Sequence, residues 1–334
     1  MSEYINSRKD SSFVDRWEWR KFIENIYGLE HFWYVARKNG KIDGFLGLAL
    51  SNHRIFGRYL VTAPFASQGG FYADSEDTFL ALIGKAEELQ NKIRASYTLI
   101  RHMNKKWDLP AGWQNDHSYA TYNLNLDKDF DFYSKEYIRG TLRNTINRFS
   151  KHELSVMFGR FELIEDFWKV ISRSMKELGS PYHSKRYLEA LEGCMGSKAE
   201  FILSKAGDGR IIGGGLLITH LDKMEILHMN ALKEYKSMNV ADFLYWSTIR
   251  ECYRRKIHSI DMGRSLVESG NEKYKMKWKP IRNVLYYSYR LTPNMKAPKL
   301  NQRNPRLKFA INVWQRMPLV VANFLGPRLI SGIL

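Results

Sequence analysis

The order of apolar runs along the chain is the feature that most constrains its fold. In the first half, three short runs of apolar or β-branched residues, 32–37, 45–51 and 59–63, precede an apolar helical period at 79–93. The second half repeats this order, with runs at 199–204, 211–219 and 224–231 before a predicted helix. Runs of this length with turn signals between them predict strands in an antiparallel meander. The repeated order predicts two related α/β domains, although the halves share no visible sequence identity.

Length and charge agree with two domains and an anionic partner. A chain of 334 residues exceeds the size at which one hydrophobic core usually stops growing. The net charge of +17 predicts an anionic partner without distinguishing nucleic acid, a phosphorylated lipid carrier and an anionic membrane face. Two cysteines, Cys194 and Cys252, are too few for a disulfide framework and lack metal-ligand spacing. No bound metal is therefore expected. A cytoplasmic location is expected because the cysteines are few and residues 1–6 lack an apolar signal core.

The first candidate site follows a predicted strand near residue 260. Asp261 and Met262 precede Gly263, Arg264 and Ser265. Open α/β sheets bind ligands beyond the carboxyl ends of their strands, so the last three of these residues could hold an anionic group. The alternative is a solvated turn in which Arg264 pairs with a surface carboxylate.

The first half offers a weaker candidate. The loop at 64–70 ends in Gly69 and Gly70, whose backbone could approach a ligand closely, although a plain turn explains the residues equally well. A strand at 119–126 is expected to close the first sheet. The scattered histidines of the first half, His31, His53, His102 and His117, are interpreted as structural residues.

A basic helix is predicted between the halves, at 133–152. Lys135, Arg139, Arg143 and Asn147 recur every fourth residue, and Arg148 adds to the charge. Like charges at this spacing repel each other, so either an anionic ligand balances them or they form a solvated basic face.

A polar loop leads into the predicted helix after residue 240. Helix N-termini expose unpaired backbone N–H groups and the positive end of a dipole, so this loop, with Lys236 and Asn239, could bind phosphate or a developing oxyanion. The alternative is an ordinary helix cap formed by Ser237 or Asn239.

Four motifs resemble the FemAB-type proteins, in particular those of exopolysaccharide and exosortase (PEP-CTERM) systems. The motifs are DMGRS, GNEKYKMKWKP, SMKELGSP and NVADFLYW. The resemblance implies tandem GNAT-like domains of the acyl-CoA N-acyltransferase fold, each with a mixed, mostly antiparallel sheet flanked by helices. It gives a first domain at 1–131, a connecting basic helix at 132–152, a second domain with the donor site at 153–291, and a tail at 292–334.

The resemblance also implies roles for individual residues. Lys275, which follows Tyr274, matches a lysine that helps the transition state in the resembled peptidyltransferases, and a surface lysine is the alternative. Arg143 and Arg148 would face phosphate groups. The acyl-CoA loop of GNAT enzymes has a central glycine where this chain has Asn239. The absence of this glycine is compatible with aminoacyl-tRNA as the acyl donor in place of acyl-CoA.

Two further residues are candidates for proton transfer. His228 lies in the middle of a predicted strand, on the face of Met224 and Asn230 if the alternation holds, and could be a general base or a structural residue. Asp261 could orient His228 or Lys275, or could cap the following loop.

The tail combines basic and apolar residues. Lys296, Lys299, Arg303, Arg306, Lys308 and Arg316 precede the apolar run at 317–327. Prolines and Asn323 interrupt this run, so it is not expected to span a bilayer. It predicts either peripheral contact with the inner face of the cell membrane or packing against the protein's own surface.

Together these observations predict an acyltransferase. An amine of a peptidoglycan or exopolysaccharide precursor, linked to a nucleotide or a lipid, would attack an aminoacyl or acyl ester in a cleft between the domains. The alternatives are an acyl-CoA-dependent N-acyltransferase and a non-catalytic module that binds RNA or a lipid-linked saccharide in polysaccharide assembly.

Overall fold

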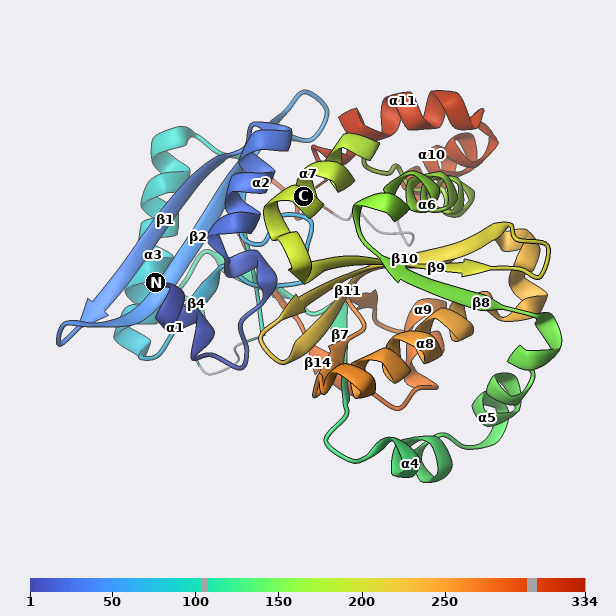
Figure 1. The fold of residues 1–334 in the computed structure, drawn as a ribbon. Coiled ribbons are helices and arrows are strands. Elements are labelled where there is room, and N and C mark those ends of the chain that lie inside the picture. Colours follow the sequence, from blue (N-terminus) through green and yellow to red (C-terminus); the bar gives the residue numbers. More distant parts are fainter. Residues whose placement is uncertain (104–106, 299–304, 334) are drawn as a thin grey trace. The chain divides into compact units, whose positions relative to one another are not determined.

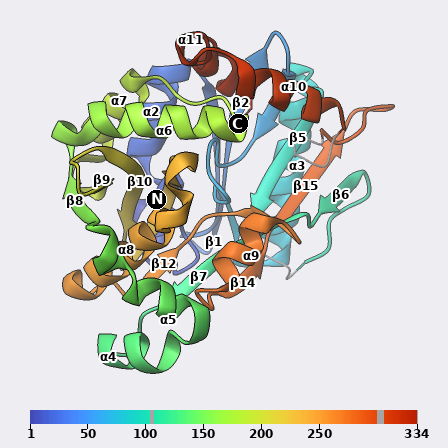
Figure 2. The ribbon, with the colours of Figure 1, turned by 90° about the vertical axis from the view of Figure 1, so that its right-hand side faces the viewer.

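The computed structural model describes residues 1–103, 107–298 and 305–333 (Figures 1 and 2). The chain forms two compact units. Unit 1 comprises Met1–Thr121, Asn283–Lys299 and Ser331–Leu334, and unit 2 comprises Tyr122–Arg282 and Leu300–Ile330.

Unit 1 is built on a mixed sheet with the order β1-β2-β3-β5-β15-β6, with β4 paired to β2. Its strands are β1 (Glu30–Lys38), β2 (Lys41–His53), β3 (Gly57–Val61), β4 (Phe71–Ala73), β5 (Tyr97–His102), β6 (Trp113–Asp116) and β15 (Tyr286–Leu291). Its helices are α1 (Ser2–Asn6), η1 (Phe13–Asp15), α2 (Trp17–Tyr27) and α3 (Glu76–Ile93).

The predicted meander of the first half is confirmed. β1, β2 and β3 pair antiparallel, and Asn39 and Gly40 take the positive φ angles of 50° and 77° that a tight hairpin turn requires. The apolar period of α3 then covers one face of the sheet, where Phe79 and Leu82 are buried against Leu46 and Leu48 of β2. Alternation along β2 sends Phe45 to the other face, against Ile5 of α1.

Unit 2 contains the second mixed sheet, of order β13-β7-β12-β11-β10-β9-β8, with β14 paired to β7. Its strands are β7 (Tyr119–Asn125), β8 (Ser155–Gly159), β9 (Ala199–Lys205), β10 (Ile211–His220), β11 (Lys223–Ala231), β12 (Ser259–Asp261), β13 (Ser265–Leu266) and β14 (Ile281–Val284). Its helices are α4 (Phe130–Phe132), η2 (Tyr133–Tyr137), α5 (Gly140–Asn147), η3 (Phe149–His152), η4 (Phe161–Leu163), α6 (Ile164–Leu178), α7 (Lys185–Met195), η5 (Gly196–Lys198), η6 (Lys233–Met238), α8 (Val240–Arg255), α9 (Gly270–Met276), α10 (Pro305–Arg316) and α11 (Leu319–Ile330).

The centre of the second sheet opens on one side. α6 and α8 cover opposite faces of the sheet (Figure 1). β11 and β12 run parallel, but they pair only over residues 223–225 and 259–261. Beyond this point β11 continues to Ala231 while the other strand turns away at Met262. The pairing of β11 and β12 therefore ends at their C-terminal edge, and α/β folds place ligands at the C-terminal ends of their strands.

The predicted domain boundaries differ from the division of the structure. The strand predicted at 119–126 was expected to close the first sheet, and that prediction is wrong, because β7 pairs with β12 of the second sheet. The first sheet instead gains β15, which lies between β5 and β6. Unit 1 thus ends at Thr121 and takes up residues from 283 onward. Alternation and length identify strands but not their partners, because distant pairing depends on tertiary packing.

The predicted continuous helix at 133–152 is also wrong. Ile138 and Arg139 are extended, with ψ angles of 112° and 168°, and Gly140 has a φ angle of 60°. Three short helical segments, η2, α5 and η3, replace the single helix. The basic residues at four-residue intervals therefore do not form one continuous row on a helix face.

Candidate functional site

A turn after β12 forms the base of the candidate site. The Asp261 carboxylate accepts a hydrogen bond of 2.8 Å from the Gly263 backbone N–H and is buried. Gly263 has a φ angle of 73°, and a Cβ atom there would lie 3.2 Å from the Ile226 carbonyl oxygen of β11. This conformation and this close approach both favour glycine. The turn therefore directs the carbonyl groups of Gly263 and Arg264 into the opening between the two strands.

Lys275 of α9 fills this turn. Its Nζ donates hydrogen bonds to the carbonyl oxygens of Gly263, at 2.7 Å, and Arg264, at 3.1 Å. The Nζ also lies 5.4 Å from the centre of the Tyr122 ring, and the residue is only 4% exposed. An ammonium group has three donors. One N–H of Lys275 is thus left without an acceptor among the described residues, so the alternative of a surface lysine is contradicted.

Burial alters the acidity of this group. The pKa of Lys275 is lowered to about 8, mainly by desolvation; the charge of Asp261 opposes this shift, and the charge of Arg264 adds to it. At neutral pH the amine is therefore mostly protonated but close to its midpoint. A buried ammonium in low dielectric is suited to stabilise negative charge that develops on a neighbouring acyl oxygen.

A second carboxylate joins α9 to the start of α8. Asp242, in the first turn of α8, is buried and accepts a 2.8 Å hydrogen bond from the Tyr274 hydroxyl. It also forms an ion pair with Lys277, whose Nζ lies 3.9 Å from the centre of the Tyr274 ring. Desolvation raises the pKa of Tyr274 well above its usual value, and the charge of Asp242 raises it further. Tyr274 therefore remains a neutral donor that positions α9 against α8.

Glu272 fixes the other side of α9. Its carboxylate accepts hydrogen bonds from the Tyr122 hydroxyl, at 2.7 Å, and from Arg282, at 2.8 Å. Ser265 is buried and accepts a 3.0 Å bond from the Asn271 side chain. Ser265 thus links β13 to α9, and its hydroxyl contacts the protein's own helix.

The N-terminus of α8 has no side-chain cap. Asn239 is the N-cap residue in the left-handed region, with a φ angle of 54°, and its amide donates to the Ser237 carbonyl at 3.4 Å. Asn239 thus occupies the N-cap position that the alternative predicted, but its side chain makes no capping hydrogen bond to the helix. Lys236 lies in η6, immediately before this end, and its side chain is exposed. The first N–H groups of α8 thus remain available as donors for an anion.

His228 is held in a separate aromatic cluster. Its ring centre lies 5.2 Å from that of Tyr182 and 5.9 Å from that of His183. A bulge between Ile226 and His228 interrupts the strand alternation that was assumed in the sequence analysis. Burial lowers the pKa of His228 to about 4, so the imidazole is neutral at pH 7. No hydrogen bond or ring contact joins His228 to Lys275 in the described part of the chain, and its role as a base stays a prediction.

Arg143 and Arg148 have different surroundings. Arg143 donates to the carbonyl oxygens of Ile138, at 3.0 Å, and Ser134, at 3.1 Å, so it satisfies acceptors at the break before α5. Arg148 is exposed, and its side chain has no partner among the residues that the structure describes. Arg143 is thus partly buried while Arg148 is exposed, and the phosphate-facing role predicted for both residues remains untested.

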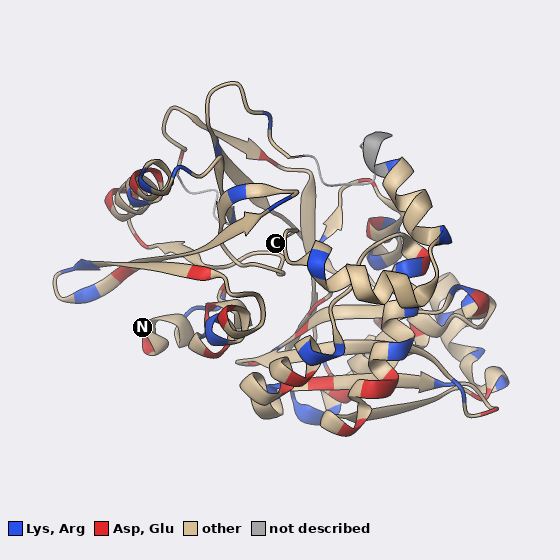
Figure 3. Ribbon diagram, turned by 90° about the horizontal axis from the view of Figure 1, so that it is seen from above, with Lys and Arg blue, Asp and Glu red and all other residues tan. Residues whose placement is uncertain are grey.

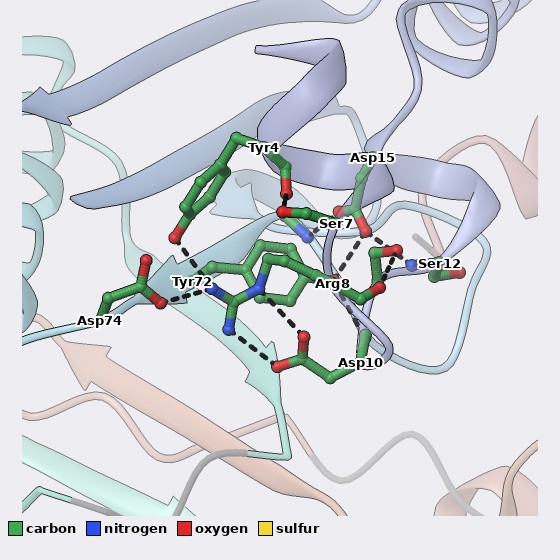
Figure 4. A network of polar contacts seen from close by, with 10 residues as sticks. Tyr4, Ser7, Arg8, Asp10, Ser12, Asp15, Tyr72 and Asp74 are labelled. Atoms are coloured by element: carbon green, nitrogen blue, oxygen red, sulfur yellow. Dashed lines mark hydrogen bonds and ion pairs between the residues drawn. The ribbon is translucent and has the colours of Figure 1, made fainter. Parts of the chain in front are cut away.

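The Gly69–Gly70 loop belongs to unit 1, where its donors have internal partners. The Gly70 N–H donates to the buried carboxylate of Asp15 at 2.6 Å, and the Gly69 N–H donates to the Arg101 carbonyl at 3.2 Å. Asp15 also accepts from the Tyr72 hydroxyl at 2.6 Å, within the network that includes Arg8 (Figure 4). A ligand bound by these glycines would have to displace Asp15.

Two further features of the structure bear on the chemistry. Within residues 1–103, 107–298 and 305–333, no cluster of His, Cys, Asp and Glu could hold a metal ion. A cavity of about 470 Å³ in unit 2 is lined by Phe130, Phe158, Arg250 and Tyr253, among others, and not by Lys275.

Comparison with known proteins gives one matching family and several similar folds. Residues 138–276, which include η6, α8 and Lys275, match the acetyltransferase (GNAT) domain family. A solved structure of FemX has a TM-score of 0.65 at 11% identity, over 85% of this chain and 94% of that chain. L-PGS from Bacillus licheniformis has a TM-score of 0.58 at 16% identity, over 90% and 96%. A tandem GNAT protein from the clavulanic acid biosynthesis pathway has a TM-score of 0.53 at 12% identity, over 80% and 85%.

The chain has a tandem GNAT fold. The predicted fold class is thereby confirmed, and residues 138–276 of the second half are similar to the acetyltransferase (GNAT) domain family. No curated protein matches the sequence. The uncapped end of α8 and the diverging strands β11 and β12 both lie within the matched GNAT domain.

Asp242 and Glu272 are not among the predicted site residues, although both position α9. A signal for Asp242 was present in the sequence, since it lies three residues after Asn239, the spacing of a capping box. That pattern predicts a carboxylate directed at its own helix end, whereas Asp242 contacts Tyr274 and Lys277. Tertiary packing decided between the two outcomes.

Proposed function

We propose that the protein transfers an aminoacyl or acyl group to an amine of an anionic cell-envelope precursor, as a FemAB-like member of the GNAT enzymes. The observation that carries this proposal is the buried ammonium of Lys275, held by two carbonyl groups between β11 and β12, with one N–H without an acceptor among the described residues. A lysine with a purely structural role would be expected to use all three N–H donors within the protein. In a catalytic lysine, the third N–H can bind the acyl oxygen.

The proposed reaction begins when the neutral amine nitrogen attacks the carbonyl carbon of the ester. A C–N bond forms, and the carbonyl electrons move to oxygen, which becomes an oxyanion close to Lys275 Nζ. Collapse of this intermediate breaks the C–O bond, and the departing oxygen takes the proton that the amine nitrogen loses. Preorganised donors in such sites contribute about 10² to 10³ in rate. Asp261 would act through Lys275 by favouring its protonated form.

The donor is proposed to be aminoacyl-tRNA. The uncapped N-terminus of α8, preceded by Lys236, supports an anion at this point, and Asn239 places a side chain where the acyl-CoA loop of GNAT enzymes has glycine. The acyl-CoA alternative is favoured by the match to the acetyltransferase (GNAT) domain family over residues 138–276. Coenzyme A that raises the melting temperature of the protein would support this alternative.

The acceptor is proposed to be a nucleotide- or lipid-linked precursor of peptidoglycan or exopolysaccharide in the cytoplasm. The similarity of fold to FemX and L-PGS supports an envelope precursor as the substrate class. The exposed side chains of Lys236, Arg148 and Arg264 are candidates to contact its anionic groups.

Transfer to candidate acceptors tests this proposal. Purified protein would be incubated with a mixture of aminoacyl-tRNAs, or with acyl-CoAs, and with amine-bearing nucleotide-linked and lipid-linked precursors, and products would be detected by mass spectrometry. We expect Lys275→Met to lower turnover about 100-fold or more. Lys273→Met is the matched control, because Lys273 is an exposed lysine on the same helix. Full activity of a folded Lys275→Met protein would remove Lys275 from the mechanism.

A further inference from the structure

The two C-terminal helices of unit 2 form a hairpin that is fixed on one side. The inner face of α10 and α11 contains Trp314, at 8% exposure, and Ala322, at 3%. Gln315 donates a 3.0 Å hydrogen bond to the Glu177 carbonyl at the end of α6, and both helices contact α6 (Figure 1). The predicted packing of the tail against the protein's own surface is thus correct for this face only.

The outer face of the hairpin is apolar and exposed. Phe309 and Val313 of α10 are 75% and 46% exposed, and Val320 and Phe324 of α11 are 81% and 62% exposed. Each pair has a spacing of four residues, so its side chains lie on the same stripe of the helix. Val321 adds a further exposed side chain, at 41%. Exposed apolar side chains that gather on neighbouring helices usually mark an interaction site.

The C-terminal segment that forms this surface carries charge of one sign. The 62 residues from Lys273 to Leu334 contain 13 Lys and Arg and no Asp or Glu, whereas the preceding 272 residues contain 39 basic and 35 acidic residues. The described parts of α10 and α11 thus carry no acidic residue (Figure 3). Lys308 and Arg316 are exposed on α10. On α11, the Arg328 guanidinium lies 4.1 Å from the centre of the Phe324 ring.

We infer that the hairpin docks the protein on an anionic lipid bilayer, with the apolar stripe in the headgroup boundary and the basic residues at the phosphates. Interfacial helices combine an apolar face with Lys and Arg in this way. Because Arg328 lies beside Phe324, its charge could stay at the lipid headgroups while the Phe324 ring enters the bilayer. A second copy of the chain is a poorer occupant, because a two-fold contact would bring two hairpins of the same charge together.

Docking differs from insertion across the bilayer. In the described part of the chain, no helix has the length and apolarity to cross a membrane. Lys299 and Arg303, which were assigned to the basic tail, lie outside the described residues. The inference therefore depends on residues 308–328 and the charge pattern alone, and its test requires no enzymatic activity.

Vesicle flotation of the full chain tests the inference. Wild-type protein would be mixed with vesicles of phosphatidylcholine alone or with 30% phosphatidylglycerol, at low and high salt. We expect at least tenfold tighter binding to the anionic vesicles, with weaker binding at high salt. The double variant Val320→Ser/Phe324→Ser should reduce binding to anionic vesicles at least tenfold, and Lys308→Gln/Arg316→Gln should remove most of the preference for phosphatidylglycerol.

Matched variants control for these substitutions. Ile55 and Phe161 are 68% and 64% exposed outside the hairpin, so Ile55→Ser/Phe161→Ser should leave binding within twofold of wild type. Phe309→Ser/Val313→Ser on α10 provides a second hairpin variant if the first has an altered thermal melt. Equal flotation of the hairpin and control variants, or absence of wild-type binding to anionic vesicles, would overturn the inference. So would a wild-type dimer in light scattering that Val320→Ser/Phe324→Ser converts to a monomer.

Discussion

The ammonium of Lys275 lies 2.7 Å from the carbonyl oxygen of Gly263, in a turn whose shape is set by the Asp261 carboxylate. This relationship brings a positive charge into a site where Lys275 is only 4% exposed. The turn carbonyls replace only part of the water that the ammonium loses on burial. The pKa of Lys275 is lowered for this reason. A group near its midpoint at neutral pH responds measurably to small changes in its surroundings.

The first prediction concerns the pH dependence of transfer. If the protonated form of Lys275 stabilises the oxyanion, then kcat/KM should fall as the pH rises through about 8, where the ammonium loses its proton. The arginine variant Lys275→Arg should lack this descending limb, because a guanidinium stays charged. The measurement is kcat/KM between pH 6 and 10 with a donor that is stable over this range. A descending limb that persists in Lys275→Arg would assign it to another group.

The second prediction concerns stability. The pKa of Lys275 falls from 10.5 to about 8 on folding, so between these values the unfolded chain binds more protons than the folded one. The free energy of unfolding should therefore rise with pH in this window, by about 2 kcal/mol between pH 7 and 9.5. Urea unfolding at both pH values should show this gain in wild type and in Lys273→Met, but not in Lys275→Met. The same gain in all three proteins would contradict the lowered pKa.

The third prediction concerns the link between α8 and α9. Asp242→Asn keeps the shape of the side chain but removes the charge that pairs with Lys277 and accepts from Tyr274. We expect a loss of about 2 to 4 kcal/mol in the free energy of unfolding, because a buried, hydrogen-bonded charge pair loses one partner. Turnover should fall through a lower kcat, since α9 carries Lys275. Asp166→Asn, at an exposed position in the first turn of α6, controls for the substitution.

Local features of the fold followed from the sequence more reliably than long-range ones. The turn at Asn39 and Gly40 and the end of α6 at Gly179 are fixed by the conformational preferences of a few adjacent residues. The exchange of β7 and β15 between the sheets has no local signal, because the residues of a strand do not specify which sheet it joins. The break at Ile138–Gly140 had a signal in Gly140, but the apolar period concealed it.

The same distinction applies to the candidate site. DMGRS and Tyr274-Lys275 were identified by motif, and the structure brings Asp261, Arg264, Ser265 and Lys275 together around one turn. The burial of Lys275 was not predictable from its neighbours, since Lys273, Lys277 and Lys279 give the segment the composition of a solvated surface. Packing against Tyr122 from a distant strand decides its environment.

The fourth prediction concerns mild acid. Burial lowers the pKa of His228 and of His31 to about 4, so both rings stay neutral in the folded protein while the unfolded chain binds protons below about pH 6.5. The melting temperature should therefore fall as the pH decreases from 6.5 to 4. His228→Phe, which keeps a ring against Tyr182, should show a smaller fall than wild type. His258→Phe replaces an exposed ring and controls for the substitution.

The fifth prediction concerns the loop that was assigned to ligand binding. Asp15 accepts hydrogen bonds from the Gly70 N–H, the Tyr72 hydroxyl and the Ser12 N–H, all within unit 1. Asp15→Asn replaces one acceptor oxygen by a donor that faces other donors. We expect the free energy of unfolding to fall by about 2 to 3 kcal/mol, since buried hydrogen bonds to a charged acceptor are among the stronger ones.

Asp10→Asn is the matched control for Asp15→Asn, because the Asp10 side chain is about half exposed in its ion pair with Arg8. Exposed ion pairs contribute about 1 kcal/mol at most, so this variant should unfold close to wild type. Catalytic turnover at low temperature, where both variants are folded, should equal that of wild type if the Gly69–Gly70 loop only holds Asp15. A selective rise in KM for the acceptor in folded Asp15→Asn would instead show that this loop reaches the substrate.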